Sequence, residues 1–212
     1  MKLTTLNDLV LDWADKRGIL EHSSATAQMV KLLEEYGELA SGVAKNDKAK
    51  IKDSIGDCLV VAIIIRGIGG RTDCVFDKLP QFESFCVDTY TAQMAVVHCV
   101  EYLGRVAWQL NRPLQSSDSI IDEQLTDFVR SLRDVAYHFD TTLDECLQLA
   151  WDEIKDRKCL MREGVFIKLS DLEQQLLELD KEIAEEVFYK RDVTELKRQA
   201  DELQDLIVKA KR

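Results

Sequence analysis

The chain has 212 residues, of which 46% are hydrophobic, and a formal net charge of −11 at pH 7. This length suits one domain with an appendage or two small domains, and the hydrophobic content is enough for a core. The acidic balance leaves no basic footprint for broad nucleic-acid binding. It does not exclude a nucleotide substrate, because a bound metal ion inverts the local charge.

The composition also limits the fold class. Nine glycines and two prolines indicate long helices with few turns, and alternating β-branched residues are almost absent. We therefore expect an all-α protein built as a helical bundle. No signal peptide or membrane span is visible, so the expected compartment is the cytoplasm, with no membrane partner. The six cysteines form no Cys-x-x-Cys pair, which favours buried reduced thiols.

Three helices are predicted in the first third of the chain. An amphipathic helix over 3–16 is followed by two long helices over 26–44 and 48–66. The first long helix has the i, i+3, i+4, i+7 apolar spacing of a core-facing stripe, with a possible capping loop at 22–24. The second is apolar nearly all round, which predicts a buried helix, and it ends at the glycine-rich run 67–70.

Further helices are predicted over 91–110, 119–139 and 141–158, the last opened by a capping box from Thr141 to Glu145. Residues 164–168 are expected to form a short strand. The tail, 169–212, has two apolar runs whose heptad phase slips between Ile183 and Val193. It is therefore either one long coiled-coil helix or a helical hairpin that turns near residues 191–192. Either form predicts a packing or oligomerisation element.

Three acidic residues and one serine of the two long helices are placed symmetrically about Asn46. Glu35 and Asp57 lie eleven positions either side of it, and Glu38 and Ser54 lie eight. If the helices are antiparallel and joined there, each pair lies at one height. With a rise of 1.5 Å per residue, these heights are roughly 12 and 16 Å from the turn. The symmetry therefore predicts that acidic side chains from both helices converge.

Two further carboxylates adjoin these positions, since Asp53 precedes Ser54 and Glu34 precedes Glu35. Carboxylates that gather in one volume need a counter-charge. Ligands that are all oxygen suit Mg²⁺, with Mn²⁺ as the alternative. The competing interpretation is that Glu-x-x-Glu marks a solvent-exposed helix face. Asp57, at the start of an apolar run, argues against that interpretation.

The run Lys31-Leu32-Leu33-Glu34-Glu35-Tyr36-Gly37-Glu38-Leu39-Ala40, followed by Asp53-Ser54-Ile55-Gly56-Asp57, resembles the MazG-like nucleoside triphosphate pyrophosphohydrolases. These proteins belong to the all-α group that also contains the dimeric dUTPases. The family pattern is Glu-x-x-Glu, a gap and then Glu-x-x-Asp, so Ser54 takes the place of the third carboxylate.

A second match, Asp152-Glu153-Ile154-Lys155-Asp156-Arg157-Lys158 followed by Gly164-Val165-Phe166, is similar to the segment that closes the domain in phage-type members. The resemblance covers roughly 1–67 and 140–168. It implies a MazG-like domain at 1–168, with 68–139 as an inserted second helix pair and 169–212 as a tail outside the resemblance. A weak echo of residues 26–29 at 91–94 makes the inserted pair either a degenerate copy or a chance match.

The resemblance implies Mg²⁺-dependent hydrolysis of a nucleoside triphosphate between its α and β phosphates. It implies metal ligation by Glu35, Glu38 and Asp57, and Asp53 is the candidate to substitute for the missing third carboxylate. Glu34 or Glu35 is the candidate to orient and deprotonate the attacking water.

The resemblance also implies that Lys155, Arg157 or Lys158 contacts phosphates. The alternative for this cationic run is a solvated helix end that complements the helix dipole. For the whole chain, the alternative to an active enzyme is a catalytically decayed scaffold that acts as a helical interaction protein through its tail. In both cases we expect a homo-oligomer.

Overall fold

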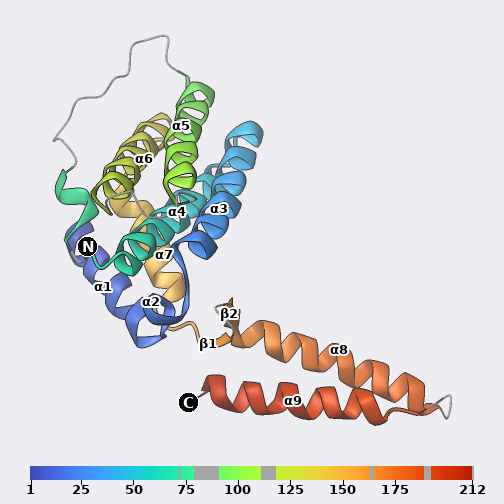
Figure 1. The fold of residues 1–212 in the computed structure, drawn as a ribbon. Coiled ribbons are helices and arrows are strands. Elements are labelled where there is room, and N and C mark those ends of the chain that lie inside the picture. Colours follow the sequence, from blue (N-terminus) through green and yellow to red (C-terminus); the bar gives the residue numbers. More distant parts are fainter. Residues whose placement is uncertain (72, 79–90, 111–117, 163–164, 189–191, 212) are drawn as a thin grey trace. The chain divides into compact units, whose positions relative to one another are not determined.

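The computed structural model describes residues 1–71, 73–78, 91–110, 118–162, 165–188 and 192–211 (Figure 1). Two compact units are present, Met1–Lys155 and Asp156–Arg212. The first contains α1 (Leu3–Lys16), α2 (Ile19–His22), α3 (Ala25–Lys45), α4 (Lys48–Ile68), the 3-10 turn η1 (Val75–Lys78), α5 (Ala92–Leu110), α6 (Asp118–His138) and α7 (Leu143–Ile154). The second contains β1 (Cys159–Arg162), β2 (Val165–Lys168), α8 (Leu169–Phe188) and α9 (Thr194–Lys211). The predicted all-α fold is confirmed, with one short hairpin of strands in the second unit.

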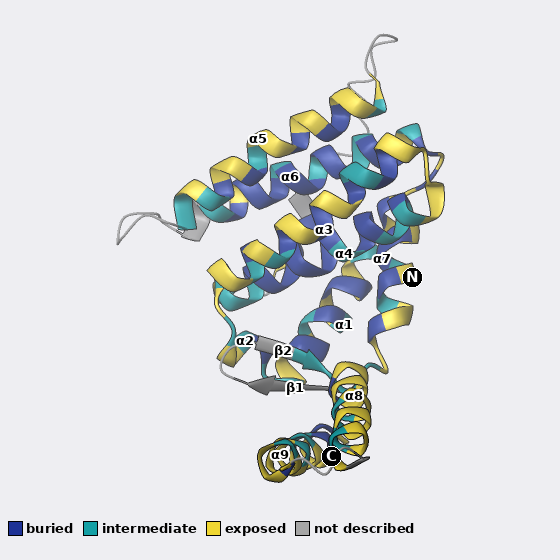
Figure 2. Ribbon diagram, turned by 90° about the vertical axis from the view of Figure 1, so that its right-hand side faces the viewer, coloured by how far each residue is buried: buried dark blue, intermediate teal, exposed yellow. Residues whose placement is uncertain are grey.

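Helix α4 is the centre of the first unit and packs against α1, α3, α6 and α7. Its apolar run predicts burial all round, and Ile55, Leu59 and Ile63 are each at most 1% exposed. The helices around it are amphipathic, so α3 and α5 each carry one buried stripe and one exposed stripe (Figure 2). None of the described helices is both long and apolar enough to cross a membrane.

Local sequence determines where α3 begins and ends and where α4 begins. The Ser24 side chain caps α3 by accepting a hydrogen bond from the Ala27 amide at 3.1 Å. At the other end, Asn46 adopts the left-handed conformation with φ 54°, and the Asp47 amide donates to the Gly42 carbonyl in a Schellman motif. The Asp47 side chain then caps α4. These two residues make the tight antiparallel turn that the sequence predicts.

Helices α5 and α6 form a second antiparallel pair within the segment predicted as an insertion. They pack against each other, and α5 also contacts α3 while α6 contacts α4. The Tyr36 hydroxyl of α3 donates to the Val96 carbonyl of α5. The Tyr36 ring also meets Phe128 of α6 edge-on, with 6.2 Å between the ring centroids. One side chain therefore connects the acidic segment of α3 to both helices of the second pair.

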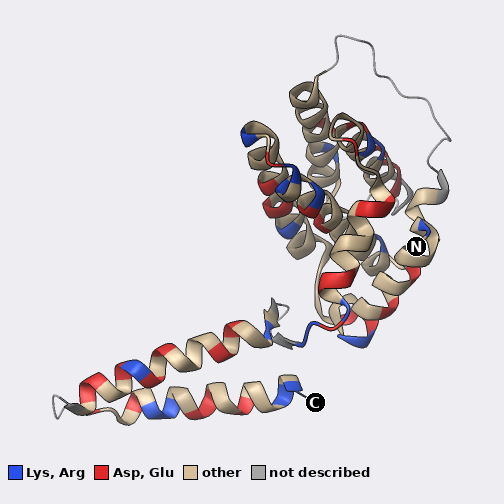
Figure 3. Ribbon diagram, turned by 180° about the vertical axis from the view of Figure 1, so that it is seen from behind, with Lys and Arg blue, Asp and Glu red and all other residues tan. Residues whose placement is uncertain are grey.

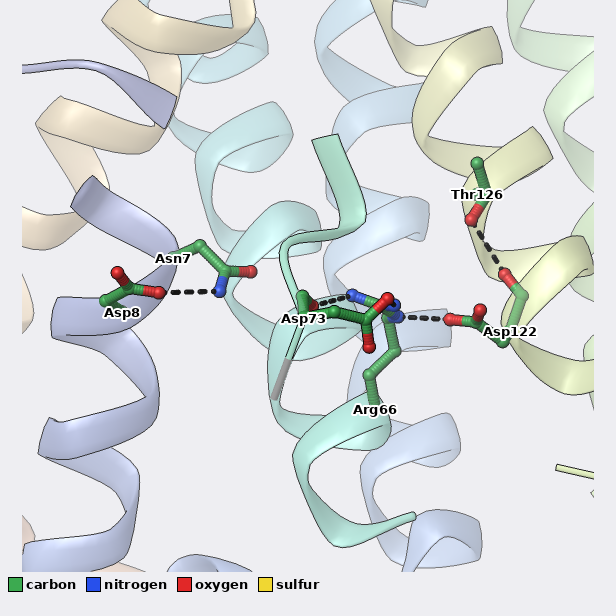
Figure 4. A network of polar contacts seen from close by, with 6 residues as sticks. All are labelled: Asn7, Asp8, Arg66, Asp73, Asp122 and Thr126. Carbon is green, nitrogen blue, oxygen red and sulfur yellow. Dashed lines mark hydrogen bonds and ion pairs between the residues drawn. The ribbon is translucent and has the colours of Figure 1, made fainter. Parts of the chain in front are cut away.

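A buried ion network joins the end of α4 to α6. Arg66 is 4% exposed, and its Nε donates to the Asp122 carboxylate. Its Nη1 donates to the Asp73 carbonyl at 2.7 Å, and its Nη2 lies 3.2 Å from the Asp73 carboxylate (Figure 4). A buried guanidinium needs such partners, because an unpaired charge in the interior is strongly destabilising.

The second unit is a two-stranded sheet followed by a helical hairpin. Strands β1 and β2 pair antiparallel, with Cys159 opposite Lys168 and Arg162 opposite Val165. Strand β2 confirms the predicted strand, whereas β1 was not predicted, and the helix expected to reach residue 158 ends at Ile154.

The tail is two helices, which agrees with the helical hairpin, one of the two forms that the sequence left open. Helices α8 and α9 pack on each other around a small core of Leu172, Ile207 and Ala210 (Figure 1). Part of the expected turn, at Arg191, lies outside the described residues. The domain limits at 1–168, 68–139 and 169–212 stay predictions.

The cysteine side chains that the structure describes are buried free thiols, as expected for reduced core residues. They are Cys58, Cys74, Cys99 and Cys146. Cys86 lies outside the described residues.

Candidate metal site on helices α3 and α4

The carboxylates of α3 differ in their exposure. The Glu35 side chain is 10% exposed, whereas the Glu34 side chain is 60% exposed. Lys31 lies one turn before both, and its Nζ is 2.7 Å from Glu35 Oε1 and 2.9 Å from Glu34 Oε2. Partial burial lowers the pKa of Lys31, but hydrogen bonds to the two carboxylates outweigh it, and the net shift is upward. The two predicted catalytic residues therefore share one ammonium group.

The register of α3 against α4 agrees with the predicted symmetry about residue 46. A Cβ on Gly42 would lie 3.0 Å from Ile51 Cγ1 and 3.4 Å from Lys50 Cγ, so position 42 faces positions 50 and 51. Glu38 of α3 lies one turn farther from the bend than Gly42, and its carboxylate is 3.3 Å from the Lys50 ammonium of α4. Because both helices rise 1.5 Å per residue, Glu38 is at about the height of Ser54.

Glu35 of α3 and Asp57 of α4 both influence the pKa of one buried thiol, Cys58. Burial is the main cause that raises the pKa of Cys58 well above its usual value, and the charges of Glu35 and Asp57 raise it further. The register of the two helices puts positions 35 and 57 at about one height, because each lies eleven residues from residue 46.

Ser54, the residue in place of the third family carboxylate, faces the interior. It is 1% exposed, and its Oγ makes no hydrogen bond within the described part of the chain. Asp53, its predicted substitute, is only partly buried. A buried hydroxyl without a partner costs about 1–3 kcal/mol. It is therefore an oxygen that a bound, hydrated ion could satisfy.

The donor set fits a hard divalent cation in its chemistry. Every candidate ligand from α3 and α4 supplies oxygen, and each comes from one of two neighbouring antiparallel helices. However, among the residues that the structure describes, no three His, Cys, Asp or Glu side chains lie close enough together to hold a metal ion. The carboxylates of Glu35 and Glu38 form ion pairs with lysine ammonium groups instead. Figure 3 shows the mixed charges on this helix pair.

The predicted phosphate-binding cations divide between the two units. Lys155, the last residue of the first unit, pairs with Asp152 at 2.7 Å, and this hydrogen bond lowers the pKa of Asp152. Its backbone carbonyl accepts from Arg17. Arg157 and Lys158 belong to the second unit, and their role stays a prediction.

Sequence reasoning did not single out the two lysines that hold the α3 carboxylates. Lys31 precedes Glu35 by four residues, and this helical spacing is a sufficient signal for an ion pair. Lys50 could have been found from the symmetry about residue 46, since it lies one turn nearer the bend than Ser54. The residues that face the candidate ligands are therefore visible in the sequence once the helix pair is accepted.

The fold and the site together define an all-α protein with its candidate acidic ligands on one antiparallel helix pair. Residues 23–76, which contain this pair, match the MazG nucleotide pyrophosphohydrolase domain. An uncharacterized 18.2 kDa protein from the rep-hol intergenic region of Haemophilus phage HP1 is 34% identical over 149 residues, covering 65% of this chain and 91% of the phage protein. No solved structure matches the chain. The chain belongs to the MazG-like family, as its motifs indicate.

Proposed function

We propose that this protein is a divalent-ion-dependent nucleotide pyrophosphohydrolase. Its substrate would be a nucleoside or deoxynucleoside triphosphate, cleaved by water between the α and β phosphates to a monophosphate and pyrophosphate. The observation that carries the proposal is the antiparallel register of α3 and α4, in which Glu35 and Asp57 would lie at about one height. The family match covers both residues and supports the same conclusion. The expected compartment is the cytoplasm.

Glu35, Glu38 and Asp57 would hold the ion, with Asp53 as a further candidate, and the family generally uses divalent metal ions. Mg²⁺ is the ion that the all-oxygen donor set favours, and Mn²⁺ is the alternative. When bound, the ion would neutralise charge on the phosphate oxygens, which phosphoanhydride cleavage requires.

The remaining residues would place the reactants. Glu34 or Glu35 would accept a proton from the attacking water, and the exposed Glu34 side chain has the freer access to solvent. Lys155, Arg157 or Lys158 would hold the phosphate tail and supply positive charge in an acidic protein. Positioning of this kind accounts for most of the rate enhancement expected in phosphoryl chemistry.

The test is release of pyrophosphate from a panel of nucleoside triphosphates with Mg²⁺. Glu38→Ala is expected to abolish release and to leave the helical CD spectrum unchanged. The matched control is Glu173→Ala, because Glu173 has the same 49% side-chain exposure and also pairs with a lysine, Lys211, across a helix pair. Release by Glu38→Ala at the wild-type rate would remove Glu38 from the site.

A second candidate function is a helical interaction protein on a decayed enzyme scaffold. Two observations favour it: Ser54 brings no charge, and no cluster of three acidic ligands is formed within the described ranges. Calorimetric titration with Mg²⁺ separates the two functions. A binding isotherm that is lost in Asp57→Ala supports the enzyme, whereas no binding by the wild-type chain supports the scaffold.

The tail is the candidate oligomerisation element in either case. Its hairpin has a core of only a few buried residues, while Leu177, Val187 and Val208 remain at least 43% exposed. Helix α8 carries seven acidic residues and one basic residue, and Figure 3 shows this predominance. Light scattering on the full chain and on Leu177→Glu would test a homo-oligomer, since a new charge on the apolar face should dissociate it.

A further inference from the structure

Each of the two acidic ligand candidates on α3 is held by its own lysine. Lys31, on the same helix, lies 2.7 Å from Glu35 Oε1 and bridges to Glu34. Lys50, on the facing helix, lies 3.3 Å from Glu38 Oε2. The two ammonium groups come from different helices and neutralise the carboxylates that the metal would need.

An ammonium group and a divalent ion compete for the same carboxylate oxygens. Two cations that share one carboxylate repel each other at close range, so they do not occupy it together at low energetic cost. Lysine is suited to such an exchange, because its charge is compact and its four-carbon stem is flexible. The side chains of Lys31 and Lys50 are 44% and 35% exposed, so each ammonium can move into water when it is displaced.

We propose that Lys31 and Lys50 are built-in counter-ions of the divalent-ion site. They neutralise Glu35 and Glu38 when the ion is absent, they are displaced when it binds, and they thereby set its affinity. This inference rests on the proposed function, since it assigns a role to two residues that face the same site. It also explains why Glu35 and Glu38 are not gathered into a ligand cluster, because each of these two side chains is drawn toward a lysine.

The first test is calorimetric titration of Mg²⁺ into Lys31→Met, with the wild-type chain as reference. Removal of a partly exposed ion pair of this kind should tighten Mg²⁺ binding about two- to fivefold. The matched control is Lys16→Met, because Lys16 pairs with Asp12 at 2.5 Å and i, i+4 spacing on α1, outside the site. Both variants lose one positive charge, so a general charge effect would appear in both. Lys50→Met provides an independent repeat from the facing helix.

The second test is thermal unfolding with a chelator and with saturating Mg²⁺. With the chelator, Lys31→Met should melt below the wild-type chain, because the ion pair is lost. With Mg²⁺ this difference should disappear, because the wild-type lysine is already displaced. A lysine that merely supports the helix would give the same difference under both conditions.

The outcomes separate the inference from the proposed function. Wild-type binding of Mg²⁺ with unchanged or weaker binding by both lysine variants would overturn the counter-ion role and leave the metal site standing. No Mg²⁺ binding by the wild-type chain or by either variant would overturn both. Tighter binding in the two lysine variants and not in Lys16→Met would support both.

Discussion

Gly56, within the acidic motif of α4, is where α7 approaches this helix most closely among the described glycines. A Cβ built there would lie 2.3 Å from the Cys146 carbonyl oxygen and 2.9 Å from the Ala150 Cβ. Real Cβ atoms do not approach other atoms closer than 3.0 Å. The atom in the way belongs to the backbone of α7, so a rotamer change cannot relieve the contact. Gly56→Ala must therefore move one helix relative to the other.

The size of the effect follows from this geometry. Relief of the contact from 2.3 to 3.0 Å needs a shift of at least about 0.7 Å between α4 and α7. We expect a cost of about 3 kcal/mol, the upper part of the range for overpacked cores, because backbone has to move. The higher helix propensity of alanine offsets about 1 kcal/mol of this destabilisation. The net loss of about 2 kcal/mol should lower Tm by roughly 4–8 °C in a chain of this length.

Gly37→Ala is the matched control, because Gly37 lies within the acidic motif of α3. No atom lies within 4 Å of a Cβ at this position. Here only the helix propensity changes, so stability should rise by about 0.5–1 kcal/mol and Tm by roughly 1–4 °C. Thermal unfolding followed by far-UV CD measures both variants. A rise in Tm of the same size for Gly56→Ala would refute the close approach of α7.

Three further predictions concern buried polar groups. Arg66→Met removes the counter-charge of the buried Asp122 and should lower the free energy of unfolding in urea by about 3–5 kcal/mol. Adding Asp122→Leu to the same chain should restore part of the lost stability. Tyr36→Phe removes only the hydroxyl that donates to Val96 and should cost about 1 kcal/mol; an unchanged urea midpoint would contradict this. Burial raises the pKa of Cys99 to about 12 from an ordinary value of 9.0, so the unfolded chain releases this proton first. The contribution of the protonated Cys99 thiol to the stability of the fold is complete below about pH 8–9 and falls from pH 9 toward pH 12. Tm should therefore drop between pH 8 and 10, and it should drop less in Cys99→Ala.

The long helices were predictable because their end signals are local. Ser24 before α3 and Asn46-Asp47 after it specify a cap and a turn within a few residues, and the structure uses all three. The Thr142 cap of α7 was predictable in the same way. Strand β1 was not, because its residues show no period-2 pattern, and it exists only through pairing with β2.

The positions of the candidate site residues along α3 and α4 could be predicted from the sequence, but the partners that their side chains contact could not. The symmetry about Asn46 depends only on the helical rise, and the contact of Gly42 with Ile51 agrees with it. Which cation a carboxylate meets depends on side-chain directions and on competing partners. Arg66 illustrates the limit, since its partner Asp122 lies 56 residues away and no local pattern relates the two.

Ser54 is best understood through the charge balance of the helix pair. Glu35, Glu38 and Asp57 bring three negative charges to α3 and α4, and Lys31 and Lys50 neutralise two of them. A fourth carboxylate at the buried Ser54 position would add a negative charge beyond the two that the lysines neutralise, and burial would make it costly. A hydroxyl avoids that cost and leaves an oxygen whose missing hydrogen bond a hydrated ion can supply. Serine at this position therefore lowers repulsion on the helix pair and keeps an oxygen atom where the family pattern has a carboxylate.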